Sequence, residues 1–333
     1  MPNSDFTIKK EISRSAEVID SNLQSRYIVI ESGAKLRHID VKAKKLLVRS
    51  NSNLTDCKMF SYGMIDIGNN VIIKEHTVIN AFKSISIGDR TIIDRDVFVG
   101  GMQSEKSQIR IGSDCVVLFR SYLNTTRKIL IGNGVGIGGY CLIFTHSAWQ
   151  NVLDGNPYKF ADVKIKDNAW IPWNVTVLPG VIINQDVTVG SGSVITKSLP
   201  TSVFAAGVPA KVIQKKDDRR LSIDRKHAIA LEILSDFREY ALHYLKLKNV
   251  VIKNSYSFAI SFRSKRLIYT LDFQSLKEDD VIISFRVPPK IKHRHEWVEL
   301  DTLDAKTNEN IGKHFIVFLR RYGIKIKKSS MLP

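Results

Sequence analysis

Cysteine, acidic residues and long apolar runs are all scarce in this chain of 333 residues. Three cysteines are too few, and odd in number, for a disulfide framework, which indicates a reducing compartment. The apolar runs are far shorter than the roughly 20 residues that a membrane-spanning helix needs. Residues 1–11 lack the apolar core of a secretory signal. We therefore expect a cytoplasmic protein.

The shortage of acids leaves a strong positive charge, with 50 lysines and arginines against 33 acids and a net charge of +17. Residues 215–333 hold 25 of these cations and 15 of the acids. Such an excess suits an acidic glycan or the inner face of a membrane, and equally a merely solvated surface. The sequence has no nucleic-acid-binding motif, so we expect no nucleic-acid partner.

A period of six residues dominates the stretch 163–196. A helix repeats its apolar face every 3.6 residues and a strand every 2, so a period of six fits neither alone. It predicts short strands with a sharp corner after each one. The positions that recur every sixth residue are all β-branched aliphatics: Ile165, Ile171, Val177, Ile183, Val189 and Ile195.

The same register runs backwards in sets of three, which gives three faces and 18 residues per coil. We expect the glycine of Ile67-Gly68 and of Ile131-Gly132 to serve a tight corner with unusual backbone angles. The pattern predicts a triangular parallel β solenoid filled by stacked aliphatic ladders. The earlier sets are Ile67, Ile73, Ile79; Ile87, Ile93, Val99; Ile111, Val117, Leu123; and Ile131, Ile137, Ile143.

The repeated motif aliphatic-Gly-x-x-small-x resembles that of the hexapeptide-repeat acyltransferases, a family similar to galactoside, maltose and polysaccharide O-acetyltransferases. The resemblance covers residues 65–213 and extends loosely over 27–64. Its closing segments, 190–197 and 205–213, match closely. The resemblance implies a left-handed parallel β-helix, a homotrimer, and acetyl-CoA as co-substrate with no metal. A zinc site is also disfavoured because His76 and His146 fall in different registers.

His146 is the residue to which the resemblance assigns the chemistry. It lies three residues past the inward Ile143, and 24 residues separate it from Trp170, as in the galactoside-type enzymes. A sugar hydroxyl is a poor nucleophile, and a histidine that titrates near neutrality can take its proton. The resemblance also implies an oxyanion donor at the backbone N–H of Trp173. Pro172-Trp173 departs there from the small pair that is common in the family.

Further residues match family positions that contact the acyl donor or the acceptor. Cations beside a pyrophosphate or 3′-phosphate would offset its charge. The positions implied for acetyl-CoA are Trp170, Ser191, Thr196, Lys197 and Lys211.

Coil stacking places Asn124 beside His146, either to bind the acceptor or to steady the imidazole. The insertion 145–162 carries Trp149, Asp154 and Tyr158, which we expect to bind a sugar acceptor. The aromatic side chains could equally pin the loop to the solenoid wall. Asp154 and Asp162 are alternative candidates for an acid that orients the histidine.

The domain organisation follows from where the period of six begins and ends. We expect an N-terminal arm or cap over 1–26, the β-helix over 27–213 and a basic α+β domain over 214–333. In the last domain the patterns predict a helix over 219–247, with Tyr244 on its apolar face. Four strands follow, and then a helix over 308–322 and a short strand over 324–326.

Three functions are compatible with these patterns. The first is an acetyl-CoA-dependent O-acetyltransferase acting on a cell-surface polysaccharide, such as capsule or lipopolysaccharide, or on its lipid-linked precursor. The second is an N-acetyltransferase for a nucleotide amino sugar or an acetyltransferase for a small molecule. The third is a non-enzymatic scaffold whose basic domain binds an anionic polymer.

Overall fold

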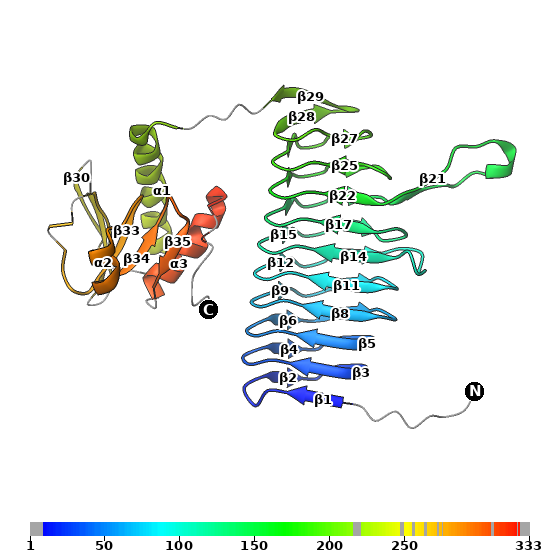
Figure 1. Ribbon diagram of the computed structural model, residues 1–333, viewed down its shortest axis with the longest axis horizontal. Coiled ribbons are helices and arrows are strands. Elements are labelled where there is room, and N and C mark those ends of the chain that lie inside the picture. Colours follow the sequence, from blue (N-terminus) through cyan, green and yellow to red (C-terminus); the bar gives the residue numbers. More distant parts are fainter. Residues whose placement is uncertain are drawn as a thin grey trace. The chain divides into compact units, whose positions relative to one another are not determined.

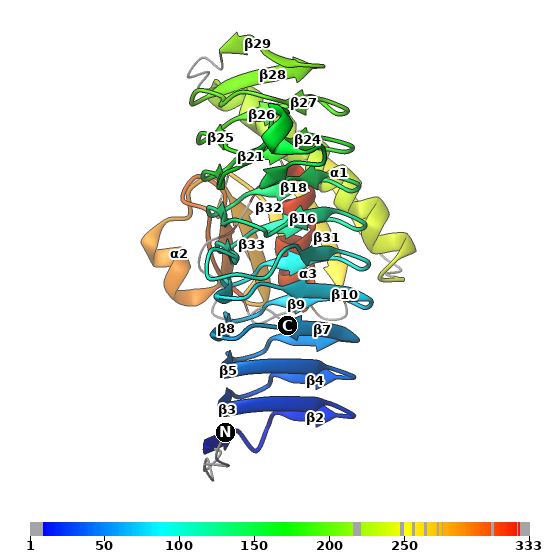
Figure 2. The same cartoon turned by 90° about the vertical axis from the view of Figure 1, so that its right-hand side faces the viewer.

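The computed structural model describes residues 9–215, 221–246, 250–254, 257–262, 265–271, 273–274, 276–307, 310–324 and 326. The chain divides into two compact units, 1–218 and 219–333, at a boundary a few residues beyond the predicted one. The first unit is a stack of coils that rises from β1 to β29 (Figure 1), and Figure 2 shows the same stack turned by 90°. The predicted fold class, a left-handed parallel β-helix with a C-terminal α+β domain, is confirmed.

Each coil visits three flat faces, which we call A, B and C in chain order. Ile165 of one coil is the register partner of Ile183 in the next, 18 residues on, as the spacing predicted. Face A contains β8 (Met64–Ile67), β11 (Ser84–Ile87), β14 (Gln108–Ile111), β17 (Ile129–Ile131), β22 (Val163–Ile165) and β25 (Ile182–Ile183).

Faces B and C complete the coils, and their strands are also short. Face B contains β2 (Glu17–Ile19), β4 (Lys35–Arg37), β6 (Asn53–Thr55), β9 (Ile72–Ile73), β12 (Ile92–Ile93), β15 (Val116–Val117), β18 (Gly136–Ile137), β23 (Trp170–Ile171), β26 (Thr188–Val189), β28 (Val203–Gly207) and the antiparallel β29 (Ala210–Lys215). Face C contains β7 (Cys57–Phe60), β10 (Thr77–Asn80), β13 (Phe98–Gly100), β16 (Tyr122–Asn124), β19 (Leu142–Ile143), β24 (Thr176–Val177) and β27 (Val194–Ile195).

The coils begin earlier than the sequence predicted. β1 (Lys9–Ile12) pairs in parallel with β3 (Asn22–Ile30), which pairs in turn with β5 (Asp40–Val48). The long strand β5 pairs with β7 on face C and with β8 on face A, so it passes around an edge. The region 1–26, predicted as an N-terminal arm or cap, belongs to the stack of coils from Lys9 onward, and residues 1–8 lie outside the described part. The charged alternation of these strands hid the period of six.

The interior is the predicted stack of aliphatic ladders. Ile143, Ile171 and Ile183 are fully buried, as are the other six-spaced positions. The cysteines take part as small hydrophobes: all three are buried, and burial raises the pKa of the Cys57 thiol to about 12. The Cys57 thiol is thus held protonated.

The glycines that follow the coil-opening aliphatics serve close stacking, which corrects the expected reason for them. Gly88 and Gly112 are outside the positive-φ region; that conformation falls two residues later, for example at Arg90 and Asp114. A Cβ at Gly88 would stand 2.6 Å from the carbonyl carbon of Gly112, which stacks on it in the next coil. These glycines let successive backbones approach, and polar residues take the left-handed corner position.

The C-terminal unit is an α+β fold with its own core. Its strands form one sheet in the order β30 to β35, with β32, β33 and β34 mutually parallel. Its elements are α1 (Ile223–His243), β30 (Val250–Asn254), β31 (Ser257–Phe262), β32 (Lys265–Tyr269), β33 (Asp280–Ser284), α2 (Pro289–Arg294), β34 (Glu296–Glu299), β35 (Asp304–Lys306), α3 (Asn310–Leu319) and the 3₁₀ turn η2 (Arg320–Tyr322).

The expected elements of this unit match in order, with local differences. The side chain of Ser222 caps α1 by accepting a hydrogen bond from the backbone N–H of Arg225, so the helix starts later than predicted. Tyr244, placed by the periodicity on the apolar face, is 78% exposed because it follows the last helical residue. Ile324 and Ile326 lie outside any strand, and Lys325 is outside the described residues. Helix α2 and strands β34 and β35 were not predicted.

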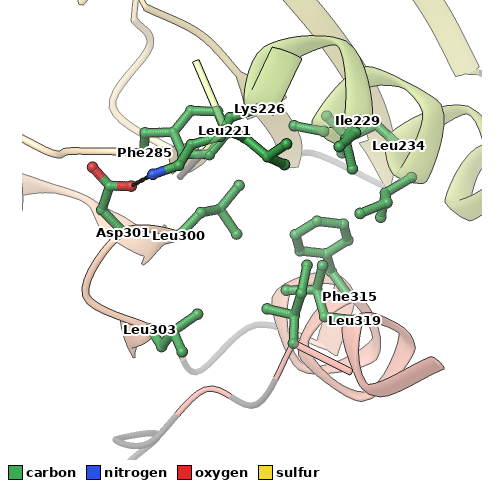
Figure 3. Close-up of a pocket in the computed structure, with 13 residues that line it drawn as sticks. Leu221, Lys226, Ile229, Leu234, Phe285, Leu300, Asp301, Leu303, Phe315 and Leu319 are labelled. Carbon is green, nitrogen blue, oxygen red and sulfur yellow. Dashed lines mark hydrogen bonds and ion pairs between the residues drawn. The ribbon is translucent and has the colours of Figure 1, made fainter. Parts of the chain in front are cut away.

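An apolar cavity of about 180 Å³ lies between α1, α3 and the loops of the C-terminal unit (Figure 3). Phe315 and Leu319 of α3 face Ile229 and Leu234 of α1 across it. An ion pair of 3.0 Å between Lys226 and Asp301 stands at its border. Within the described residues, no helix is both long and apolar enough to span a membrane.

Candidate functional site

His146 lies at the edge between face C and face A, which we call the C/A edge. The chain leaves the coil there: β20 (His146–Ser147) pairs antiparallel with β21 (Lys159–Phe160), and the loop between them projects from the wall (Figure 1). The imidazole is half-buried and stacks on the ring of Phe160, with centroids 5.7 Å apart. The insertion 145–162 therefore covers one face of the histidine ring through Phe160.

The side chain of Asn124 lies beside His146, as coil stacking predicted. Its Oδ1 is 3.0 Å from Nδ1 of the imidazole, and its own exposure is 2%. Oδ1 also accepts the backbone N–H of Thr126 at 3.2 Å, while Nδ2 donates to the hydroxyl of Tyr122 at 2.7 Å. A backbone N–H can only donate, so the orientation of the amide is fixed with its oxygen towards the histidine.

This fixed amide determines the tautomer of His146. An amide oxygen can only accept, so Nδ1 of the neutral imidazole must carry the hydrogen. The lone pair is then on Nε2, the atom not engaged by Asn124. A buried acceptor thus holds the imidazole in the tautomer that leaves Nε2 able to accept a proton.

Two further side chains, those of Thr145 and Arg127, support this arrangement, and the sequence analysis did not single them out. The hydroxyl of Thr145 donates to the backbone carbonyl of Asn124 at 2.7 Å and accepts the N–H of Arg127 at 2.9 Å. The guanidinium of Arg127 lies 4.9 Å from the centre of the Phe160 ring. In the coil before His146, Thr126 and Arg127 occupy the positions that stack on His146 and Ser147. This stacking register was the only feature of the sequence that could have identified Arg127 as part of the site.

The proposed orienting acids are elsewhere. Oδ1 of Asp162 accepts the backbone N–H of Lys128 at 3.1 Å, and Asp154 is exposed in the 3₁₀ turn Val152–Asp154. An amide, rather than a carboxylate, contacts Nδ1 of the histidine, which corrects the expectation for both acids. A Cβ at Gly180 would meet the side-chain Cε of Lys159 at 2.8 Å.

The loop residues expected to bind the acceptor are mostly open to solvent. Trp149 is 99% exposed and Tyr158 is 63% exposed, with the Tyr158 ring 6.5 Å from that of Phe160. They are not packed on the wall, so the alternative that they pin the loop is not supported. Their role in acceptor binding, like that of Asp154, stays a prediction.

The residues expected to contact acetyl-CoA are distributed over two edges and one face of a single chain. Thr196 and Lys197 follow β27, at the same C/A edge as His146. Ser191 follows β26 and stacks above Trp173 at the edge between faces B and C, where the N–H of Gly192 donates to the carbonyl of Trp173. Trp170 and Lys211 belong to face B. One chain alone does not bring these groups around His146.

Trp173 ends an aromatic column at the edge between faces B and C. Its ring is 5.2 Å from that of Phe119 and 6.4 Å from that of Tyr140, and it covers Gly139. His76 lies at the same edge, between the carboxylates of Asp56 and Asp96 at 3.4 and 3.3 Å. His76 and His146 thus stand on different edges of the chain.

Comparison with known proteins agrees with this fold. Residues 162–197 match the family model described as bacterial transferase hexapeptide (six repeats). A galactoside O-acetyltransferase of Escherichia coli is 31% identical over 137 residues, which cover 40% of this chain and 65% of the relative. A putative lipopolysaccharide biosynthesis O-acetyl transferase, WbbJ, of the same organism is 51% identical over 53 residues, or 16% of this chain and 27% of the relative.

A solved hexapeptide-repeat-containing acetyltransferase of Vibrio cholerae, complexed with acetyl coenzyme A, is 22% identical, with a TM-score of 0.36. The match covers 40% of this chain and 72% of that one. The chain spans less than two thirds of the length of the first curated relatives that it matches. The predicted resemblance to the hexapeptide-repeat acyltransferases is confirmed.

Proposed function

We propose that this protein is an acetyl-CoA-dependent O-acetyltransferase that acts on a carbohydrate hydroxyl, with His146 as general base. The observation that carries the proposal is the hydrogen bond between Nδ1 of His146 and the buried Oδ1 of Asn124. It supports a role for Asn124 in positioning the imidazole, because so buried a side chain offers an acceptor little surface. The O-acetyltransferase relatives support the same reaction class.

The reaction is a direct transfer. Nε2 of His146 takes the proton of the sugar hydroxyl as its oxygen attacks the thioester carbonyl. The resulting tetrahedral intermediate collapses, its C–S bond breaks, and the CoA thiolate leaves and receives a proton. Base catalysis of this kind contributes about 10²–10⁴-fold in rate. The N–H of Trp173 remains our candidate donor to the oxyanion.

The acyl donor requires groups from both edges. Lys197 lies two strand steps from the coil of His146, or about 10 Å along the C/A edge at the usual strand spacing. Ser191 and Trp173 lie on another edge of the same chain. A homotrimer, which the resemblance implies, would lay one edge of each copy beside a different edge of its neighbour. We propose that the donor binds between two copies.

The first test is calorimetric titration of acetyl-CoA into the purified protein. We expect about one site per chain, with binding weakened by Lys197→Glu and Lys211→Glu. Transfer to carbohydrate should fall about 10²–10⁴-fold in His146→Ala and stay unchanged in the exposed-histidine control His38→Ala. Absence of acetyl-CoA binding at millimolar concentration would overturn the proposal in favour of a scaffold. An alkali-stable product would show an amide and favour the N-acetyltransferase.

A further inference from the structure

A groove of about 540 Å³ lies on the first coils of the β-helix, away from the residues considered so far. It follows the C/A edge, because β3 and β5 pass around this edge and the chain turns from β7 to β8 there. We call it the basal groove. Its lining residues are Leu23, Gln24, Ser25, Arg26, Lys42, Ala43, Lys44, Phe60, Ser61 and Tyr62.

The charge of the basal groove has a single sign. Arg26, Lys42 and Lys44 line it, all three are exposed, and no lining residue is acidic. Within the described part of the chain, neither Lys42 nor Lys44 forms an ion pair with a carboxylate. Three cations on one hollowed surface concentrate positive potential and attract an anionic ligand.

An aromatic platform forms one wall of this groove. The ring of Tyr62 is 51% exposed and is held between Phe60, 4.9 Å away edge-on, and Phe82, 4.5 Å away. A tyrosine fixed by two neighbours presents a rigid apolar face with a polar tip, which costs little conformational entropy on binding. The apolar face of a sugar ring is a suitable partner for such a surface, with the lysines available for its acidic groups.

The basal groove is continuous with the site of His146 along one ladder. On face C, Lys42 is the register partner of Phe60, and Phe60 is the partner of Asn80. The same ladder reaches Gly100, whose partner is Asn124. Four strand steps therefore separate Lys42 from the residue that holds the catalytic imidazole, or roughly 19 Å at the usual strand spacing. A single sugar cannot span this distance, and a chain of several sugars can.

We propose that the basal groove binds an anionic polysaccharide, so that one stretch of a polymeric acceptor is held there while another stretch reaches His146. Only the statement that the polymer reaches His146 as an acceptor rests on the proposed function; binding of the polymer in the basal groove does not. The occupant is a chain of acidic sugars, since the groove offers cations and an aromatic platform on the edge that leads to the base. Residues 101–107, which connect β13 to β14 on the same edge between the groove and His146, would lie along the path of the polymer.

The experiment compares two polymers with one backbone, fluorescein-labelled dextran sulfate and neutral dextran of equal length, by fluorescence anisotropy at 150 mM salt. We expect the full-length protein to bind dextran sulfate and not dextran. The double variant Lys42→Ala/Lys44→Ala should bind at least tenfold more weakly. The matched control Lys164→Ala/Lys166→Ala, which removes two exposed lysines from face A, should stay within twofold. Equal losses in the two double variants would overturn the proposal.

A second variant separates a glycan site from a patch of charge. Tyr62→Ala leaves the charge unchanged and should weaken dextran sulfate binding several-fold, whereas Tyr140→Ala, another exposed tyrosine on a different edge, should not. Unchanged binding by Tyr62→Ala would overturn the glycan assignment. The glycan assignment would also be overturned if the protein bound 3:1 phosphatidylcholine–phosphatidylglycerol vesicles more tightly than dextran sulfate, and if Lys42→Ala/Lys44→Ala abolished that vesicle binding.

Acetyl-CoA titration of the same variants distinguishes this proposal from the proposed function. The groove variants should retain wild-type affinity for acetyl-CoA, and their KM should rise for a polymeric acceptor and not for a monosaccharide. If the wild type bound dextran sulfate through Lys42 and Lys44 but did not bind acetyl-CoA, the polysaccharide-binding proposal would hold and the acetyltransferase proposal would be wrong. If the protein bound acetyl-CoA and the two lysine substitutions did not change polymer binding, only the polysaccharide-binding proposal would be wrong.

Discussion

At the scale of single residues, the site depends on which atom of His146 is left free. The orientation of the Asn124 amide is fixed, because its oxygen accepts a hydrogen bond from the N–H of Thr126 and its nitrogen donates one to the hydroxyl of Tyr122. Position 146 could be found from the sequence, since it follows an inward isoleucine at a corner. The role of Asn124 was left open, because a spacing gives proximity and not the direction of a hydrogen bond.

Asn124→Asp tests this role through the pH profile of kcat. The carboxylate still accepts from Nδ1, but its negative charge favours the protonated imidazole, which cannot act as a base. We expect the rise of kcat with pH to move to higher pH, with little change in the KM for acetyl-CoA. Asn124→Ala should instead lower kcat across the whole range. An unshifted profile in Asn124→Asp would contradict the contact in the working enzyme.

At the scale of elements, several glycines lie where adjacent coils approach closely. A Cβ at Gly138 would stand 2.5 Å from the backbone carbonyl carbon of Pro172, and a Cβ at Gly139 would stand 2.3 Å from the ring of Trp173. The backbone of Pro172 cannot move without displacing the strand next to it. Trp173 is 37% exposed, and its ring can turn away. A side chain at Gly138 would therefore displace backbone, whereas one at Gly139 would displace only a side chain.

We expect Gly138→Ala to lower the free energy of unfolding by about 1–3 kcal/mol, the usual cost of overpacking. Gly139→Ala should cost clearly less, because the Trp173 side chain yields first. Urea unfolding of the two variants, followed by tryptophan fluorescence, measures both changes under one condition. Equal costs would contradict the view that backbone contact, and not ring contact, limits how closely the coils stack.

Glu299 anchors the end of β34 in the C-terminal unit. Burial raises the pKa of this carboxyl, but the Lys292 ammonium, the Thr302 hydroxyl and the Val287 N–H outweigh it, so that the pKa is lowered. The ammonium lies 2.8 Å from Oε2, and the N–H of Val287 lies 2.8 Å from Oε1. Because the pKa is lowered on folding, the ionised carboxylate stabilises the folded state fully when the pH is above the ordinary pKa of 4.5. This stabilisation is lost as the pH falls through the lower pKa of the folded state.

Glu299→Gln should therefore destabilise this unit at pH 7 by about 1–3 kcal/mol, because buried partners lose a charged acceptor. The difference from wild type should begin to shrink as the pH falls below 4.5, where the unfolded wild-type carboxyl takes up a proton, and should vanish once the pH has passed below the lowered pKa of the folded carboxyl. Helical circular dichroism in urea at pH 7 and pH 4 measures both. Exposed Glu278→Gln is the control and should change neither value. A difference that grew on acidification would reverse the argued sign.

At the scale of the whole molecule, two units fold around separate cores. The ring of Phe237 is fully buried in the C-terminal unit, 5.0 Å from that of Phe315 and 5.2 Å from that of Phe318. Phe237→Ala should cost that unit about 3–5 kcal/mol through the cavity it leaves. Differential scanning calorimetry should show one lowered transition, with acetyl-CoA binding retained. A loss of both would mean that the two units are energetically coupled.

The sequence by itself determined the coil, its pitch and its buried ladder, because each of these depends on contacts between residues about 18 positions apart that repeat in one register. It also determined the corner histidine, since corners recur with the same period. The period of six was not recognised in the first coils because β3 and β5 are long strands in which buried aliphatics, such as Val41 and Leu46, alternate with exposed polar residues.

Only the tertiary structure decided what lies along an edge. Side chains from separate coils, such as Lys42, Phe60 and Asn124, join one ladder although they are far apart in the chain. The hydrogen bond that fixes the His146 tautomer and the single charge of the basal groove both arise from such stacking. A periodic sequence states which residues point inward, whereas the chemistry of this protein depends on which outward residues meet when the coils are laid on one another.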